Sequence, residues 1–129
     1  MISFENDYVQ GAHPDVMRRL IETNLEPLPG YGSDPYCESA REKIRRECGC
    51  PDAEIHFLVG GTQTNAVVID AMLNGYEGVV AADTGHVAVH EAGAVEYTGH
   101  KVLTIPHHAG KIDPEELGRY LAGFYEDGN

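Results

Sequence analysis

Two groups of residues in this chain have types and spacing that could do chemistry, and the first is the turn formed by Gly60, Gly61 and Thr62. An apolar run at 55–59 leads into the turn, and an apolar helical pattern at 62–73 leads out of it. A strand, a glycine turn and a helix in this order present free backbone N–H groups and the positive end of the helix to an anion. Glycine lets the backbone approach a phosphate closely, and Thr62 can add a hydroxyl donor and cap the helix.

This turn alone does not decide between a phosphate site and a plain connection from a strand to a helix. It is not a Walker loop, because no Gly-Lys-[Ser/Thr] follows, and it is not a G-x-G-x-x-G fingerprint. The turn is therefore interpreted as a candidate anion site that needs support from elsewhere in the chain.

The second group is His86 and Glu91, which follow another apolar run. On their own, His86 could be a hydrogen-bonded loop histidine, and Glu91 could be a first-turn acid that favours its helix. His90 lies four residues after His86, a spacing that can hold a metal on a helix. No further ligand pattern joins the two histidines, so we expect no metal site.

The elements that must position these residues follow from hydrophobic periodicity and from capping residues. Strands are predicted at 55–59, 78–82 and 100–105, and helices at 14–23, 35–47, 62–73, 87–94 and 114–125. Asp34-Pro35 and Asp113-Pro114 are each typical of an N-cap followed by the first helical residue. The alternation predicts an α/β fold with a mostly parallel sheet and flanking helices, and no domain linker interrupts residues 1–129.

Charge and cysteine content restrict the partners and the compartment. The formal net charge is −12, with 21 acidic residues against 9 basic ones, so nucleic acid is not an expected partner. No apolar run approaches the roughly 18 residues that span a bilayer, and we expect no membrane partner and a cytoplasmic location. Cys37, Cys48 and Cys50 are odd in number, and the C-x-C pair is interpreted as a helix end rather than a metal or redox site.

Four stretches of the chain occur in an order that is more specific than any one of them. They are Asn6-Asp7, the run Y-G-S-D-P from Tyr31, the run G-T-Q-T-N from Gly61, and the run H-V-A-V-H-E-A-G-A from His86. Together they resemble the N-terminal part of the threonine aldolase / aromatic amino acid β-eliminating lyase family. These are pyridoxal 5'-phosphate (PLP) enzymes of the aspartate-aminotransferase fold, fold type I. The resemblance covers residue 2 to about residue 120.

The resemblance implies a role for each group of residues described above. Gly60, Gly61 and Thr62 correspond to the turn that holds the phosphate of PLP. His86 corresponds to the histidine that stacks on the pyridine ring, and it is the expected catalytic residue because it could assist proton transfer. Glu91 is expected to support the cofactor site by hydrogen bonding.

Two further residues are matched to the substrate. Asn6 stands where the family often has a serine near the substrate carboxylate, which is a departure from the pattern. Tyr31 resembles a tyrosine that lines the site, often across a dimer interface. The implied reaction is cleavage of a β-hydroxy amino acid to glycine and an aldehyde, in a homodimer or homotetramer. The alternative is a non-catalytic α/β module that binds a phosphorylated small molecule or acts as an assembly partner.

PLP chemistry also needs a lysine that forms a Schiff base with the cofactor. The chain has Lys43, Lys101 and Lys111, and none lies in a context that resembles the family's cofactor lysine, which comes later in those sequences. We therefore expect this chain to be an N-terminal portion with an incomplete sheet, inactive alone, and with apolar faces and strand edges exposed.

Overall fold

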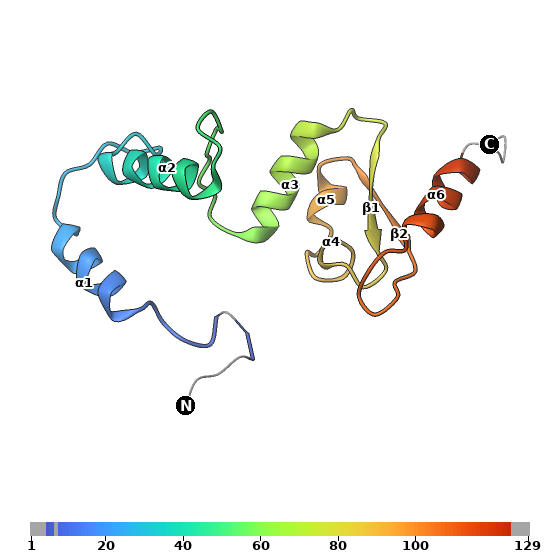
Figure 1. Cartoon of the computed structure of the whole chain (residues 1–129), viewed down its shortest axis with the longest axis horizontal. Coiled ribbons are helices and arrows are strands. Elements are labelled where there is room, and N and C mark those ends of the chain that lie inside the picture. The colour runs from blue at the N-terminus through green and yellow to red at the C-terminus, as the bar shows by residue number, and fades with distance from the viewer. Residues whose placement is uncertain (1–4, 7, 125–129) are drawn as a thin grey trace. The chain divides into compact units, whose positions relative to one another are not determined.

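The computed structural model describes residues 5, 6 and 8–124, and it divides into two units, Met1–Ile55 and His56–Asn129 (Figure 1). The first unit contains helices α1 (Pro14–Thr23) and α2 (Pro35–Cys48). Both begin at the predicted proline. The Asp34 carboxylate caps α2 by accepting the backbone N–H of Cys37 at 2.8 Å. Gly49 ends α2 with φ 63°, a left-handed conformation that glycine adopts without strain.

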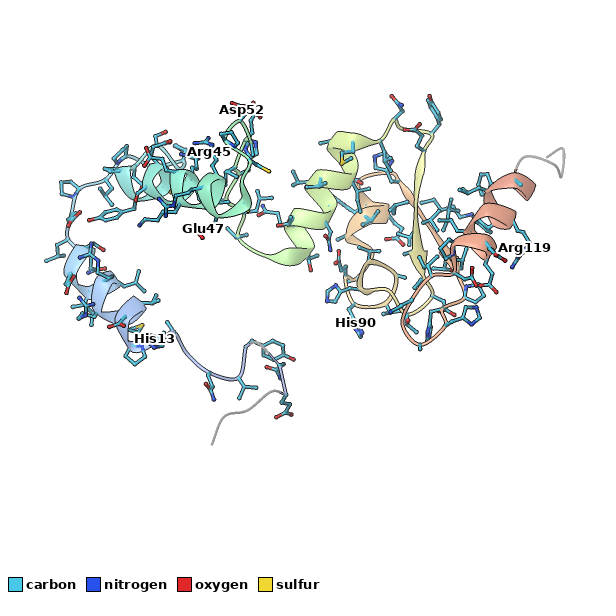
Figure 2. All side chains as sticks on the ribbon, in the orientation of Figure 1. His13, Arg45, Glu47, Asp52, His90 and Arg119 are labelled. Atoms are coloured by element: carbon cyan, nitrogen blue, oxygen red, sulfur yellow. The ribbon has the colours of Figure 1, made fainter. Side chains whose placement is uncertain are left out.

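Two arginines of α2 bind backbone carbonyl groups of the segment that follows the helix. The Nε of Arg41 donates to the carbonyl of Ile55 at 3.3 Å, and the Nε of Arg45 donates to the carbonyl of Ala53 at 2.9 Å. Figure 2 shows Arg45 beside the loop that follows the helix. Arginine can do this because its long stem lies along the protein while its guanidinium group reaches carbonyl oxygens. The helix is thereby fixed to the loop that leads to the second unit.

Helix α1 has an apolar stripe that the described part of the first unit does not cover. Val16, Met17, Leu20 and Ile21 are between 46% and 73% exposed. An exposed face of this kind needs another surface if it is to be removed from water.

The second unit is an α/β arrangement built on a parallel pair of strands. Its elements are α3 (Gly61–Met72), β1 (Gly78–Ala82), α4 (His86–Val89), α5 (Ala94–Tyr97), β2 (Lys101–Ile105) and α6 (Pro114–Gly123). The strands pair from Gly78 opposite Lys101 to Ala82 opposite Ile105. Helix α5 packs against α3, and Val95 of α5 is completely buried. The predicted fold class, α/β with a parallel sheet and flanking helices, is confirmed.

The predicted strand at 55–59 does not form. The described residues make one sheet, and it contains β1 and β2 alone. Phe57 and Val59 are 47% and 94% exposed, and the backbone N–H of Val59 is bound by the side-chain oxygen of Gln63 at 3.0 Å. A strand is stabilised through a neighbouring strand, and an apolar run without such a neighbour stays irregular.

The single helix predicted at 87–94 is also wrong, because the chain makes two short turns of helix there. Glu91 lies between α4 and α5, and its side chain is turned into the protein. Ala92 and Gly93 follow with φ 51° and φ 74°, both in the left-handed region. A right-handed helix cannot continue through two such residues. The side chain of Glu91 contacts His86 at the start of α4.

The last helix begins as predicted but is shorter. The Asp113 side chain caps α6 by accepting the backbone N–H of Glu115 at 2.8 Å. The helix ends at Gly123, whereas the prediction extended it to Tyr125, which lies outside the described residues. Glycine lowers helix propensity by about 1 kcal/mol relative to alanine, which favours an early end. Across the described ranges, no helix is both long and apolar enough to cross a membrane.

Candidate functional site

The amino end of α3 has backbone N–H groups that nothing in the helix can bind. Gly60 is the N-cap residue in extended backbone, and no side-chain hydrogen bond caps the helix. The first intrahelical bond runs from the N–H of Thr64 to the carbonyl of Gly60 at 3.0 Å. The N–H groups of Gly61, Thr62 and Gln63 therefore lack intrahelical partners. Thr62 does not cap the helix as predicted, because it lies two positions inside it.

The glycines of this turn are not required by the packing of the described residues. Gly60 has φ −175°, a conformation open to any residue. A Cβ atom built on Gly60 or on Gly61 would meet nothing within 4 Å. The space beside the free N–H groups is therefore open, and a side chain here would extend into it. Open space next to a positive helix end is what a phosphate group needs.

A buried carboxylate connects this helix to His86. The Nδ1 atom of His86 lies 2.8 Å from Oε1 of Glu91, and the Nδ2 atom of Asn65 donates to the same oxygen at 2.5 Å. The Glu91 side chain is 0% exposed, whereas the imidazole of His86 is 65% exposed. The three residues come from α3, from the start of α4 and from the turn after α4. They form one hydrogen-bonded group inside the second unit.

The carboxylate determines which nitrogen of His86 carries the proton in the neutral ring. An ionised carboxylate can only accept hydrogen bonds, so Nδ1 donates and Nε2 is left with a free lone pair. The exposed ring thus has a proton acceptor at Nε2, while its Nδ1 atom is held by the buried carboxylate of Glu91. This is the arrangement of a general base oriented by a carboxylate.

The second carboxylate oxygen of Glu91 does not share these contacts. Oε2 is buried and has no hydrogen-bond partner among the residues that the structure describes. The carboxylate is therefore positioned through Oε1, by Asn65 and His86. Asn65 belongs to the G-T-Q-T-N run, but nothing along the chain indicates that it contacts a residue 26 positions away.

The remaining histidine of this region is peripheral. His90 is exposed, and its ring centroid lies 5.4 Å from that of His86. Figure 2 shows it projecting outward from the turn after α4. Within the described residues, no three side chains of His, Cys, Asp or Glu are grouped as metal ligands would be.

The two predicted substrate residues belong to the first unit. Asn6 accepts the backbone N–H of Tyr8 with its side-chain oxygen at 3.1 Å. Tyr31 has φ 59°, and its side chain is completely exposed. A bulky residue in the left-handed region is strained, and such strain is found at functional sites and in tight turns. The assignments of Asn6 and Tyr31 to the substrate stay predictions.

Two of the lysines can be placed in the second unit. Lys101 begins β2, so it lies at the amino end of the parallel strands, whereas His86 follows the carboxyl end of β1. Lys111 forms a backbone bridge with His108 in the loop before α6. Ligands of open α/β sheets bind outside the carboxyl ends of the strands, which is the His86 side.

Comparison with known proteins matches nearly the whole chain. The family model described as beta-eliminating lyase matches residues 4–127. Low specificity L-threonine aldolases from Pseudomonas sp. (strain NCIMB 10558) and Pseudomonas aeruginosa are each 28% identical over 116 residues, which cover 88% of this chain and 33% of theirs.

A solved structure agrees with the sequence match. The threonine aldolase of Leishmania major superposes with a TM-score of 0.87 and 39% identity, covering 91% of this chain and 34% of that one. This chain therefore spans about a third of the length of the relatives it matches. Since the family match extends over residues 4–127, the chain belongs to the beta-eliminating lyase family.

Proposed function

We propose that the protein carrying this chain is a PLP-dependent lyase that cleaves a β-hydroxy amino acid to glycine and an aldehyde, as a threonine aldolase does. The observation that carries the proposal is the bond between His86 and Glu91, in the same unit as the uncapped end of α3. Family membership and the identity to threonine aldolases support the choice of reaction.

The residues at the amino end of α3 fit the phosphate group of PLP. A phosphate accepts hydrogen bonds, and the free N–H groups of Gly61, Thr62 and Gln63 are donors at the positive end of a helix. The Thr62 hydroxyl adds a further donor, and Gly60 leaves space for the ligand. When bound, PLP supplies the electron sink that Cα–Cβ cleavage needs.

His86 has two tasks in this proposal. Its exposed ring offers a flat face for stacking on the pyridine ring of the cofactor. Cleavage of a β-hydroxy amino acid also requires removal of the hydroxyl proton, and Nε2 of His86 is the atom that accepts it. Glu91 keeps the proton of the neutral imidazole on Nδ1 and so keeps Nε2 free.

The substrate contacts and the assembly are part of the same proposal. Asn6 contacts the substrate carboxylate, and Tyr31 lines the site of a neighbouring subunit in a homodimer or homotetramer. The fully exposed ring of Tyr31 on a strained backbone supports a contact with another surface. A cytoplasmic location is supported by Cys37, Cys48 and Cys50, which are all free thiols.

The test uses the whole protein that carries this chain. PLP binding is followed by cofactor absorbance, and the products from L-threonine are measured as glycine and acetaldehyde. We expect saturable PLP binding and formation of both products in equal amounts. Absence of PLP binding would contradict the proposal, whereas binding without turnover would favour the non-catalytic phosphate-binding alternative.

A further inference from the structure

We propose that Asn65 is a positioning residue, whose side-chain amide fixes the Glu91 carboxylate so that Glu91 holds His86 with its proton on Nδ1. The inference rests on the function proposed above and adds a third member to its site. Asn65 does not contact the reacting atoms in this proposal, because it acts through Glu91.

The contacts of Glu91 carry the inference. Its side chain is 0% exposed, and within the described part of the chain only Asn65 and His86 hydrogen-bond to it. His86 is itself 65% exposed and is free to move unless something holds it. The fixed member of the group is therefore Asn65, which is half-buried in the body of α3.

The amide is not needed to hold the surrounding backbone. Helix α5 packs against α3, its Val95 is completely buried, and the turn at Ala92 and Gly93 sets the path of the chain after Glu91. Loss of the Asn65 amide would leave this packing in place. What changes is the carboxylate, which would keep a single hydrogen-bond donor and could rotate about its side-chain torsions.

The position of Asn65 on α3 gives the contact a second consequence. Asn65 lies three residues after Thr62, so the two side chains share one side of the helix. The helix whose amino end is open to a phosphate thus also orients His86. A single rigid element would set both the cofactor phosphate and the base in their relative positions.

The test compares Asn65→Leu with a matched control, Asn74→Leu. The Nδ2 atom of Asn74 also donates to a glutamate, Oε2 of Glu77 at 3.1 Å, but this pair is exposed. The measurements, on the whole protein, are ¹⁵N NMR of labelled histidine without cofactor, PLP affinity, and kcat and KM for L-threonine. We expect Asn65→Leu to lower the share of the Nδ1–H form of His86 and to lower kcat by about 10- to 100-fold, with PLP affinity unchanged. Asn74→Leu should alter neither.

A second variant separates the hydrogen bond from the shape of the side chain. Asn65→Asp has nearly the same shape as the wild-type side chain, but it places a second carboxylate against Glu91. The two carboxylates can hydrogen-bond to each other only when one of them has bound a proton. As the pH falls, the ratio of kcat in Asn65→Asp to kcat in Asn65→Leu should rise. His86, which hydrogen-bonds to Glu91, and His90, whose ring centroid lies 5.4 Å from that of His86, are also titratable, and both are present in both variants.

The outcomes distinguish this inference from the proposed function. Histidine spectra and kcat in Asn65→Leu equal to those of Asn74→Leu would overturn the positioning role. If neither the wild type nor any variant cleaves L-threonine, the proposed function fails. The histidine spectra still decide the role of Asn65 in that case. If Asn65→Leu does not fold, the spectra of Asn65→Asp decide, since an unchanged His86 signal at neutral pH would also overturn the role.

Discussion

His86 Nδ1 and Glu91 Oε1 lie 2.8 Å apart, with the glutamate completely buried and the histidine largely exposed. The four residues between them complete the helical turn α4 and its C-cap, and a left-handed bend at Ala92 and Gly93 follows Glu91. The exposed ring is thus held by a group that solvent does not reach. Such a pair is able to keep one tautomer of a surface histidine.

The first prediction is that Glu91→Gln lowers kcat with little effect on PLP affinity. Glutamine has the same shape, but its amide can donate to Nδ1 of His86 and so favour the tautomer with the proton on Nε2. The loss of proton transfer is expected to cost on the order of 10²-fold in kcat. Steady-state kinetics with L-threonine measure it. Glu96→Gln, at an exposed position on α5, is the control, and equal rates in the two variants would contradict the prediction.

The second prediction concerns the phosphate donors of α3. Thr62→Val removes a hydroxyl group and keeps the shape, so the PLP dissociation constant should rise by about 10- to 100-fold, the value of one hydrogen bond to a charged group. Titration of the apoprotein with PLP measures this change. In the control Thr64→Val, the lost hydroxyl is one that already donates to the carbonyl of Gly60 at 2.9 Å. A similar loss of affinity in both variants would contradict a specific role for Thr62.

The third prediction concerns the reactivity of Cys37. The hydrogen bond between its thiol and the Asp34 carboxylate raises the pKa of Cys37 above its usual value, so less reactive thiolate is present near neutral pH. Alkylation by iodoacetamide, followed by mass spectrometry, should be slower at Cys37 than at the exposed Cys48 and Cys50. Asp34→Asn should speed the reaction at Cys37 alone. An unchanged rate at Cys37 would show that the carboxylate does not control it.

The same contact has a consequence for stability at low pH. The thiol and the backbone N–H of Cys37 lower the pKa of Asp34 below its ordinary value of 3.8. Because the folded-state pKa is depressed, the stabilisation of α2 is present above the ordinary value and is lost as the pH falls through the lowered one. Circular dichroism between pH 5 and about pH 2 should show a loss of helix that is smaller in Asp34→Asn. An identical titration in both proteins would refute this.

The fourth prediction contrasts two glycines of the second unit. A Cβ atom on Gly78 would lie 2.6 Å from the carbonyl oxygen of Lys101 in the neighbouring strand, so Gly78→Ala should lower the free energy of unfolding by about 1–3 kcal/mol. Gly118 lies inside α6 with no atom within 4 Å of such a Cβ, and Gly118→Ala should raise it by about 0.5–1 kcal/mol. Denaturant unfolding measures both, and a shift of the same sign in the two variants would be inconsistent with this reasoning.

Local features of the fold were predictable because they depend on neighbouring residues. An aspartate followed by a proline sets the start of α2 and of α6, and Gly49 ends α2 in the left-handed conformation. The bounds of β1 were predicted as observed, since a short apolar run between turns is typical of a buried strand. The helix ends need only side chains within a few positions of each other, whereas β1 also has its partner in β2.

The errors occur where distant residues decide the structure. Residues 55–59 are apolar and suited to a strand, but strand formation depends on a partner that the same residues cannot supply. The region at 87–94 has helical periodicity, yet Ala92 and Gly93 adopt left-handed backbone, and alanine gives no sign of this in sequence. His100 is a further case: it is buried, with Nδ1 3.0 Å from the carbonyl of Glu77, and sequence reasoning assigned it to a strand end.

For the candidate site, the sequence by itself determined which residues are present: a glycine turn before a helix, a histidine after a strand, and a glutamate five positions later. The family pattern followed from these types and their intervals. Only the tertiary structure decided that Asn65 reaches Glu91 and that Glu91 holds His86. The reason is physical, because a hydrogen bond depends on distance and direction, and the packing of α5 against α3 brings together residues that lie 26 positions apart.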